Sequence, residues 1–216
     1  MFVNRVSELE LLKKHFHSGK AEFFVLYGRR RVGKTELLAR FCESKRSIFY
    51  VSDLGSEISL RTALSNLVNT TLYGPNQMNA VYSTWEDLLH ALTQAAIGER
   101  LVIVLDEFPY LVAAHPPLAT ILQRIWDQTL RDGQIMLILC GSYIGMMEET
   151  VLGYQAPLYG RRTAQYLLEP LQFKDARLFY PSLNFEDQVR AYAVYGGTPA
   201  YLHTLQPQQT LKENIL

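Results

Sequence analysis

The chain has 216 residues, 48% of them hydrophobic, and its 21 basic side chains balance 21 acidic ones. A chain of this length can bury one substantial core and part of a second. Zero net charge excludes a global electrostatic field that would attract nucleic acid or an anionic membrane, although local basic patches stay open.

Apolar runs and cysteines limit the class of protein further. The longest apolar runs, residues 101–105 and 135–140, are too short for a signal sequence or a membrane span. Cys42 and Cys140 have no Cys or His partner at metal-ligand spacing, so we expect two reduced, apolar cysteines rather than a disulfide or a metal site. These features predict a cytoplasmic globular protein without a membrane partner.

The predicted elements alternate between strand and helix. Ser7 and Glu10, spaced as a capping box with apolar neighbours, predict a helix over residues 8–17. Ser83 or Thr84 is expected to cap the helix that carries Trp85. Apolar runs predict strands and amphipathic segments predict further helices: strands at 22–27, 47–51, 101–105, 135–140 and 164–168, helices near 36–42, 58–72, 85–92, 118–130 and 144–150. This alternation predicts an α/β fold with a mostly parallel sheet, helices on both faces and right-handed crossovers.

The segment between the first strand and the next helix carries the most specific motif. Residues 28–35 read Gly-Arg-Arg-Arg-Val-Gly-Lys-Thr, the pattern G-x-x-x-x-G-K-[ST] of a Walker A loop, or P-loop. Such a loop turns backbone N–H groups toward a phosphate chain and is backed by the positive end of a helix dipole. The flanking strand and helix favour this interpretation over a plain glycine-rich turn. The motif therefore predicts a nucleoside triphosphate as ligand.

Each position of the loop has an expected role. Lys34 reaches the β- and γ-phosphates, and the hydroxyl of Thr35 coordinates Mg²⁺. The glycines provide backbone freedom and the other loop residues provide backbone groups, so the predicted cofactor-binding set here is Gly28, Arg29, Arg30, Arg31, Val32, Gly33, Lys34, Thr35 and Glu36. The three arginine side chains are expected to point away from the phosphates, toward solvent or a partner.

A second motif follows the third apolar strand, which ends in Asp106 and Glu107. The carboxyl ends of strands in an open α/β sheet form the crevice where ligands bind. We expect Asp106 to hold Mg²⁺ opposite Thr35, as a Walker B carboxylate does, and Glu107 to orient and deprotonate the attacking water. The alternative is that the pair only caps a following turn.

Two further candidates come later in the chain. Ser142 follows the fourth strand, where its hydroxyl can contact the γ-phosphate or the water, or else cap a helix. Arg161, followed by Arg162, precedes the last strand, and a guanidinium stabilises a phosphoryl-transfer transition state. We expect Arg161 to act on the nucleotide of its own chain or in a transient dimer. The alternatives are action across a ring interface and a solvated loop.

Six motifs together carry a family resemblance over nearly the whole chain. They are Phe-Val-Asn-Arg-x-x-Glu-Leu at 2–9, the P-loop, the 106–107 pair, Cys-Gly-Ser-Tyr-Ile-Gly-Met-Met at 140–147, Pro-Leu-Tyr-Gly-Arg-Arg-Thr at 157–163 and Gly-Gly-Thr-Pro-Ala-Tyr-Leu at 196–202. The chain resembles the archaeal-type ATPases, which belong to the STAND class related to AAA+ proteins. The resemblance implies strand order 5-1-4-3-2, ATP and Mg²⁺ as cofactors, an adenine site that includes Asn4 and Arg5, and a helical lid whose Pro199 faces the nucleotide.

The same resemblance gives the expected domain organisation. Residues 1–170 form the P-loop ATPase domain and residues 171–216 begin the helical lid. Family members usually continue beyond such a lid, so we expect this chain to be a fragment or a truncated form.

The sequence thus predicts a Mg²⁺-dependent ATPase that acts as a slow, nucleotide-controlled switch. A first rival is a scaffold that holds ATP or ADP without hydrolysing it, and only Glu107 favours hydrolysis over it. A small-molecule kinase is disfavoured because no acceptor pocket is recognisable. A DNA-associated ATPase is weakened by zero net charge, and DNA would bind only through a missing C-terminal region. A protein partner or a homo-oligomer stays open.

Overall fold

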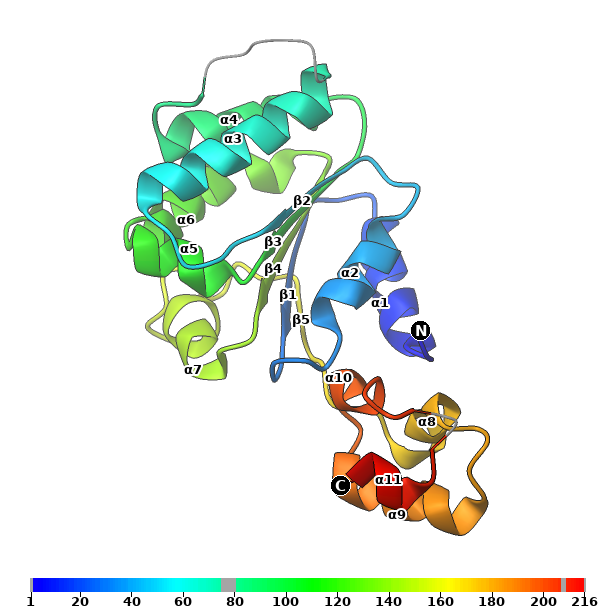
Figure 1. Ribbon diagram of the computed structural model, residues 1–216. Helices are drawn as coiled ribbons and strands as arrows, with labels where there is room; N and C mark the ends of the chain where they lie inside the picture. The colour runs from blue at the N-terminus through cyan, green and yellow to red at the C-terminus, as the bar shows by residue number, and fades with distance from the viewer. Residues whose placement is uncertain (1, 75–80, 207–208, 216) are drawn as a thin grey trace.

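The computed structural model describes residues 2–74, 81–206 and 209–215, and a five-stranded parallel sheet forms its centre (Figure 1). The strands are β1 (Glu22–Tyr27), β2 (Ser47–Val51), β3 (Leu101–Asp106), β4 (Ile135–Gly141) and β5 (Ala164–Leu167). Their order is β2-β3-β4-β1-β5, and each neighbouring pair is parallel. This confirms the expected order 5-1-4-3-2, read from the opposite edge.

Helices cover both faces of the sheet (Figure 1). One face is covered by α1 (Val6–Phe16) and α2 (Lys34–Cys42); the other is covered by α3 (Glu57–Tyr73), α4 (Trp85–Ala95), α5 (Phe108–Ala114) and α6 (Leu118–Gln128). Successive strand residues alternate between two cores: Phe23 and Val25 pack under α3 to α6, whereas Phe24 and Leu26 pack under α1 and α2. Burial on both faces explains why the strands are continuous apolar runs. None of the described helices has the length and apolarity to cross a membrane.

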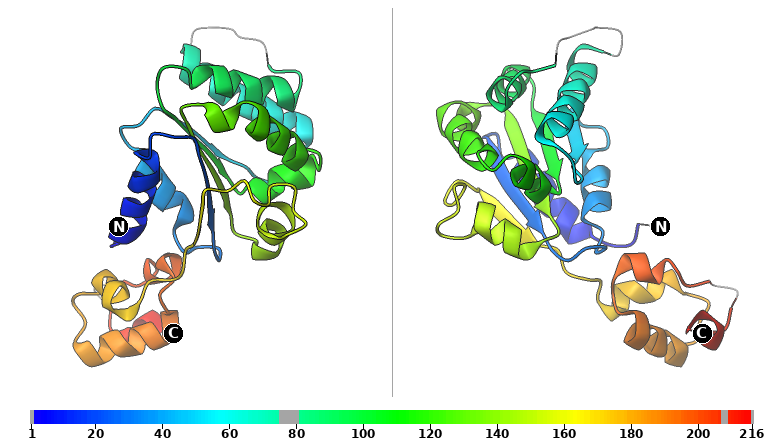
Figure 2. Two further views of the ribbon diagram at one scale, coloured as in Figure 1. Left: turned by 180° about the vertical axis from the view of Figure 1, so that it is seen from behind. Right: turned by 60° about the vertical axis from the view of Figure 1, so that its left-hand side comes forward.

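Residues 171–206 and 209–215 form a separate small layer, which we call the helical unit (Figure 2). It contains α8 (Phe173–Ala176), α9 (Phe185–Tyr195), α10 (Pro199–Leu202) and α11 (Leu211–Ile215). Its own core includes Leu171, Ala176, Tyr180, Ala191, Leu202 and Leu205. The unit lies next to the carboxyl ends of the strands, with α10 nearest to the P-loop (Figure 1).

Local predictions had mixed outcomes. Thr84 caps α4, since its side chain accepts a hydrogen bond from Asp87 N. The capping box at Ser7 was wrong, because α1 begins two residues earlier than predicted and Arg5 is its N-cap, with no side-chain capping bond. Asn4 and Arg5 both have left-handed backbones (φ 54° and 70°), so the chain enters the helix by a turn that the capping pattern does not describe.

Several short helical elements connect the longer ones. The predicted helix near 144–150 is split into α7 (Ile144–Met147) and a π-helical turn, Glu148–Leu152. Helix α5 follows Glu107 directly and was not expected as a helix. A 3₁₀ turn, Leu130–Asp132, precedes β4, and another, Arg177–Phe179, follows α8.

Candidate active site at the carboxyl edge of the sheet

The P-loop joins β1 to α2 and depends on unusual backbone angles. Gly33 is the N-cap of α2 with φ 95°, and Arg31 also has a left-handed backbone, φ 69°. Gly28 has φ 151°, and a Cβ atom there would lie 2.3 Å from the Leu168 carbonyl oxygen. The loop therefore starts in close contact with the segment that leaves β5, where no side chain fits.

Lys34 is the most informative residue of the site. Its side chain begins α2 and the residue is only 4% exposed. The ammonium donates to the carbonyl oxygens of Gly28 and Arg29, both at 3.0 Å, and to Ser142 Oγ at 2.7 Å. Within the described residues no carboxylate is among these partners. A buried cation that has only neutral acceptors lacks a counter-charge, and Lys34 in addition lies at the positive end of the α2 dipole.

Thr35 and Asp106 form an oxygen-rich pair beside this lysine. Thr35 Oγ1 donates to Asp106 Oδ2 at 2.5 Å, and Glu107 N donates to Asp106 Oδ1 at 2.9 Å. Asp106 is fully buried at the end of β3. A hydroxyl and a carboxylate are ligands that Mg²⁺ prefers, with water completing the shell. The described residues contain no cluster of three or more His, Cys, Asp or Glu suited to a metal ion.

Glu107 is held by its neighbours in a strained conformation. Its backbone is left-handed (φ 52°, ψ 41°), which is costly for a residue other than glycine. The buried Ser52, one residue beyond β2, stabilises it, because its single hydroxyl proton is shared between the carbonyl oxygens of Asp106 (2.7 Å) and Glu107 (2.8 Å). Ser142 binds the carboxylate itself, through its N–H to Oε2 at 3.1 Å and its hydroxyl to Oε1. Ser142 thus connects Lys34 to Glu107.

These residues border a cavity of about 650 Å³ between the sheet edge and the helical unit. Predicted site residues that line it are Arg5, Arg30, Arg31, Val32, Gly33, Lys34, Thr35, Glu36, Glu107, Ser142 and Pro199. Its polar groups come from the P-loop and the ends of β3 and β4. Its other wall is mostly apolar or aromatic and consists of residues not predicted: Phe2, Val3, Leu171, Phe179, Ala200 and His203.

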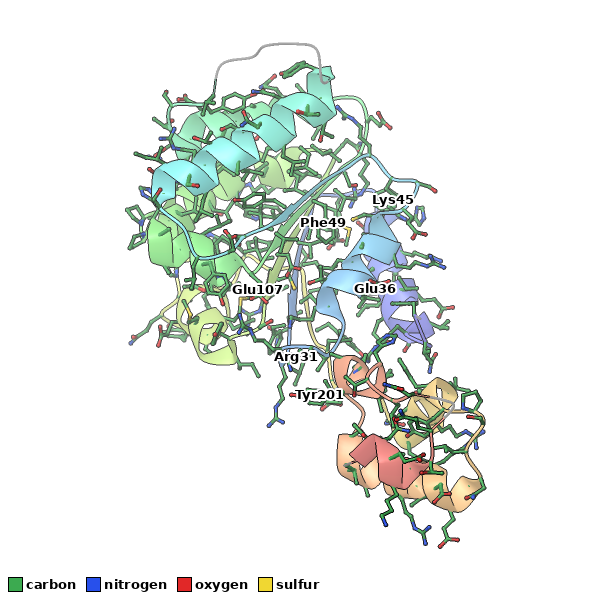
Figure 3. The ribbon with its side chains drawn as sticks, in the orientation of Figure 1. Arg31, Glu36, Lys45, Phe49, Glu107 and Tyr201 are labelled. Atoms are coloured by element: carbon green, nitrogen blue, oxygen red, sulfur yellow. The ribbon has the colours of Figure 1, made fainter. Side chains whose placement is uncertain are left out.

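The three loop arginines have different surroundings. Arg30 donates to Tyr110 Oη at 2.8 Å and lies 5.2 Å from the ring centre of Tyr143. Arg31 extends toward the helical unit, 5.7 Å from the ring centre of Tyr201 (Figure 3). Arg29 is exposed and does not line the cavity. Arg30 and Arg31 therefore border the cavity while their guanidinium groups lie beside tyrosine side chains.

The N-terminal segment borders the cavity through Phe2, Val3 and Arg5, but the side chain of Asn4 does not. Asn4 does not line the main cavity; its side-chain amide donates to Asp175 Oδ1 of α8 at 2.6 Å. Arg5 lines the cavity, but its guanidinium makes hydrogen bonds to Glu8, Val32 and Glu169. In this structure the Asn4 side chain ties the N-terminal segment to the helical unit and does not line the main cavity.

Arg161 lies at the wrong edge of the sheet for the role we predicted. It precedes β5, whose flanking residue Thr163 donates from its N–H to Phe23 O near the start of β1. The P-loop follows the other end of β1, about 20 Å away for a six-residue strand. The Arg161 guanidinium instead pairs with Asp127 of α6, at 2.7 Å for the closest contact. The structure therefore contradicts the expectation that Arg161 reaches the nucleotide of its own chain, whereas action on the nucleotide of another chain stays a prediction.

Two buried thiols belong to the core between the sheet and helices α1 and α2. Cys140, the penultimate residue of β4, is fully buried, and burial, followed by the nearby Asp106 charge, raises the pKa of its thiol well above its ordinary value. Burial likewise raises the pKa of Cys42 to about 11. Both cysteines are free.

Comparison with known proteins identifies one family and one long relative. A family model described as an ATPase domain predominantly from Archaea matches residues 2–205. An uncharacterized protein of Methanocaldococcus jannaschii is 34% identical over 207 residues, which cover 95% of this chain and 44% of that protein. The chain therefore spans less than half the length of this relative.

Solved structures share the fold. The Walker-type ATPase Paby2304 of Pyrococcus abyssi superposes with a TM-score of 0.74 at 17% identity, covering 99% of this chain and 70% of that one. The Orc1 protein of Aeropyrum pernix, solved in complex with DNA, gives a TM-score of 0.62 at 18% identity, covering 94% and 59%. At these identities the likeness concerns the fold alone.

Proposed function

This chain belongs to an ATPase domain family found predominantly in archaea, and from that premise we propose that it binds ATP with Mg²⁺, hydrolyses it slowly, and changes the position of its helical unit in response. The observation that carries the proposal is Lys34, a 4% exposed cation that faces the cavity without a carboxylate partner among the described residues. A polyphosphate would supply the missing negative charge.

The two walls of the cavity match the two ends of a nucleotide. The P-loop wall offers backbone N–H groups and Lys34 for phosphates. The opposite wall, which includes Phe2, Val3 and Phe179, offers apolar and aromatic surface suited to a base. Pro199 lies between them, 3.9 Å from the position of a Cβ atom built on Gly33. We propose that this proline contacts the bound nucleotide.

Thr35 and Asp106 fit a magnesium ion because they provide adjacent hydroxyl and carboxylate oxygens at the edge of the cavity. When bound, Mg²⁺ would neutralise phosphate charge and orient the γ-phosphate. Glu107 would accept the proton of the attacking water, since it is a cavity-lining carboxylate on the same strand end.

A specific observation also favours the rival, a non-hydrolysing nucleotide-binding scaffold. Both carboxylate oxygens of Glu107 accept hydrogen bonds from Ser142. These bonds occupy one acceptor position on each oxygen and hold the carboxylate against Ser142, so an attacking water would have to use a remaining lone pair. A carboxylate held in this way supports slow turnover, and one that never meets the water would leave a scaffold.

The test is the substitution Lys34→Ala with calorimetry against ATP in the presence of Mg²⁺. We expect the parent protein to bind and the variant to lose measurable affinity while keeping its fold by circular dichroism. Equal affinity in both proteins would contradict the assignment. Phosphate release in the parent then separates the ATPase from the scaffold.

A further inference from the structure

We propose that Arg5 is a positioning residue that couples the P-loop to the helical unit. Its guanidinium holds one peptide of the loop and, at the same time, the segment that leads into the unit. Binding of a nucleotide in the loop is thereby communicated to the unit's position. The inference rests on the proposed nucleotide binding and assigns Arg5 a role other than contact with the adenine.

The contacts of Arg5 reach three parts of the chain. Its NH1 group donates to Glu8 Oε1 of α1 at 2.9 Å. Its NH2 group donates to the carbonyl oxygens of Val32 at 3.1 Å and of Glu169 at 2.8 Å. Arg5 is only 9% exposed, so these bonds form largely out of water.

The bond to Val32 acts on the phosphate cradle. In a trans peptide the C=O of one residue and the N–H of the next point in opposite directions in one rigid plane. By holding the Val32 carbonyl oxygen, Arg5 therefore fixes the direction of the Gly33 N–H, which belongs to the loop that lines the cavity. Such preorganised N–H groups are what an anion-binding loop requires.

The bond to Glu169 acts on residues 168–170, which connect β5 to the helical unit and which we call the hinge. Gly28 of the P-loop also lies against the carbonyl group of Leu168 in this segment. The neighbouring Asn4 extends the same link to α8 through Asp175. The N-terminal segment is thus hydrogen-bonded to the P-loop, to the hinge and to the helical unit. Figure 1 shows these three parts of the chain side by side near the N-terminus.

Glu8 keeps the guanidinium in place. It is 8% exposed and accepts bonds from Arg5 and Ser7. Burial alone would raise the pKa of Glu8, but the hydrogen bonds from Arg5 and Ser7 lower it, so the carboxylate is charged. Lysine could not replace Arg5 fully, since an ammonium lacks the planar fork that serves three acceptors in fixed directions.

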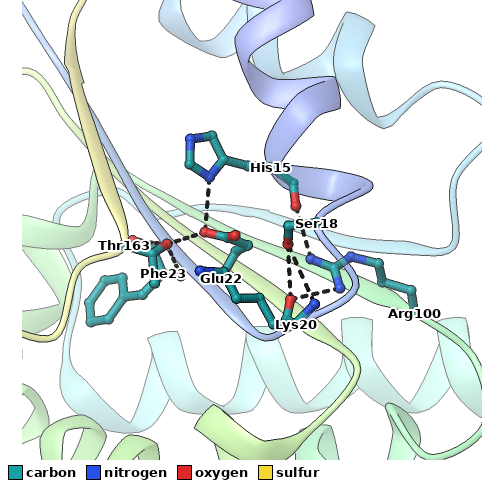
Figure 4. Close-up of polar contacts among 7 residues, drawn as sticks. All are labelled: His15, Ser18, Lys20, Glu22, Phe23, Arg100 and Thr163. Atoms are coloured by element: carbon teal, nitrogen blue, oxygen red, sulfur yellow. Dashed lines mark hydrogen bonds and ion pairs between the residues drawn. The ribbon is translucent and has the colours of Figure 1, made fainter.

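The experiment uses Arg5→Met, Arg5→Lys and a matched control, Arg100→Met. Arg100 also links two chain segments through carbonyl oxygens, those of His15 and Lys20, but at the other edge of the sheet (Figure 4). All proteins carry nitroxide labels on Asp132→Cys and Glu186→Cys, whose parent side chains are 77% and 75% exposed. Affinity for a fluorescent ATP analogue with Mg²⁺ and the distance between labels are both measured.

In the parent and in Arg100→Met we expect saturating nucleotide to shift or narrow the distance distribution. In Arg5→Met we expect affinity to fall by about tenfold, the effect of losing a charge-assisted hydrogen bond, and the distance response to vanish even at saturation. Arg5→Lys, the milder change, should show an intermediate affinity and an intermediate distance response. It replaces Arg5→Met as the test variant if the methionine variant does not fold.

Three outcomes would overturn the inference. The first is a nucleotide response in Arg5→Met and Arg5→Lys equal to that of the parent. The second is an equal loss in Arg100→Met, which would show general destabilisation. The third is a parent that binds nucleotide without any distance change. A parent that binds no nucleotide at all would instead refute the proposed nucleotide binding on which the inference rests, so this failure is distinguishable from the other three.

Discussion

Both edges of the sheet bury a charged side chain, but the partners of the two charges differ. At the amino edge, the buried Glu22 interacts with His15 at 2.9 Å and accepts a hydrogen bond from Thr163 (Figure 4). At the carboxyl edge, Lys34 is equally buried but has only neutral acceptors, and it faces a cavity. Each edge therefore buries a charge: Glu22 is surrounded by hydrogen-bonding side chains, whereas Lys34 has neutral acceptors and no carboxylate partner among the described residues.

The difference separates stability from function. A buried charge that is surrounded by its own protein's donors holds segments together, whereas a buried charge left without a counter-charge is costly and marks a ligand site. Left-handed backbones of residues other than glycine occur at both edges: Arg31 and Glu107 lie at the carboxyl edge, and Ser44, which precedes β2, lies at the amino edge. Substitutions at the carboxyl edge should change nucleotide affinity and turnover, and those at the amino edge should change the free energy of unfolding.

The largest expected effect is that of Glu107→Gln. The amide keeps the shape of the side chain but cannot accept the proton, so turnover should fall by about 10² to 10⁴ while ATP affinity survives. Steady-state phosphate release and calorimetry measure the two quantities. The matched control is Glu22→Gln, a buried glutamate at the amino edge of the same sheet, which should keep its turnover. Joint loss of binding and turnover in Glu107→Gln would mean that Glu107 is part of the metal-binding or structural framework of the site and not the base.

A smaller effect is expected from Arg161→Met at the amino edge. The variant loses the pair with Asp127 and the bonds to the carbonyl oxygens of Pro157 and Tyr159. Unfolding by urea should show a loss of about 1 to 2 kcal/mol, because these groups are partly exposed. Nucleotide affinity and turnover should not change. A fall in turnover at unchanged stability would restore the catalytic role that the sequence suggested.

The smallest effect concerns acid stability. Burial alone would raise the pKa of Glu22, but hydrogen bonds from Thr163, Ser18 and His15 lower it below its ordinary 4.5. A lowered folded-state pKa means that this stabilisation is complete above about pH 4.5 and is lost as the pH falls through the folded-state value.

Urea unfolding of the parent and of Glu22→Gln at pH 7 and pH 4 checks this. The parent should lose more of its free energy of unfolding between the two pH values than the variant does. Glu8, whose pKa is also lowered, contributes to both proteins and cancels in the comparison. An identical pH dependence would mean that Glu22 is not held as an anion.

The sequence predicts the carboxyl edge well because contiguous motifs encode it. The P-loop is one unbroken segment, and the 106–107 pair and Ser142 each follow an apolar strand directly. In a parallel sheet, strand ends converge at one edge, so adjacency to a strand end suffices to bring these residues together. The strand order came from family resemblance.

The other features depend on contacts that no local pattern records. Arg161 precedes β5 and so lies at the amino edge, although β5 neighbours the strand that carries the P-loop. Phe179 and His203, which meet at 4.9 Å between ring centres, line the cavity only because the helical unit folds back on the P-loop. The capping box at Ser7 failed because left-handed residues before a helix leave no clear sequence signal.

The buried thiols have a practical consequence for chemistry on this protein. Alkylating reagents and oxidants attack the thiolate, and a pKa of about 11 leaves Cys42 with roughly one thiolate per thousand thiols at pH 8. Cys140 is shielded further, since it lies inside β4. Dyes, spin labels or crosslinkers should therefore react with cysteines introduced on the surface in preference to the native pair, so site-specific labelling does not require a cysteine-free background.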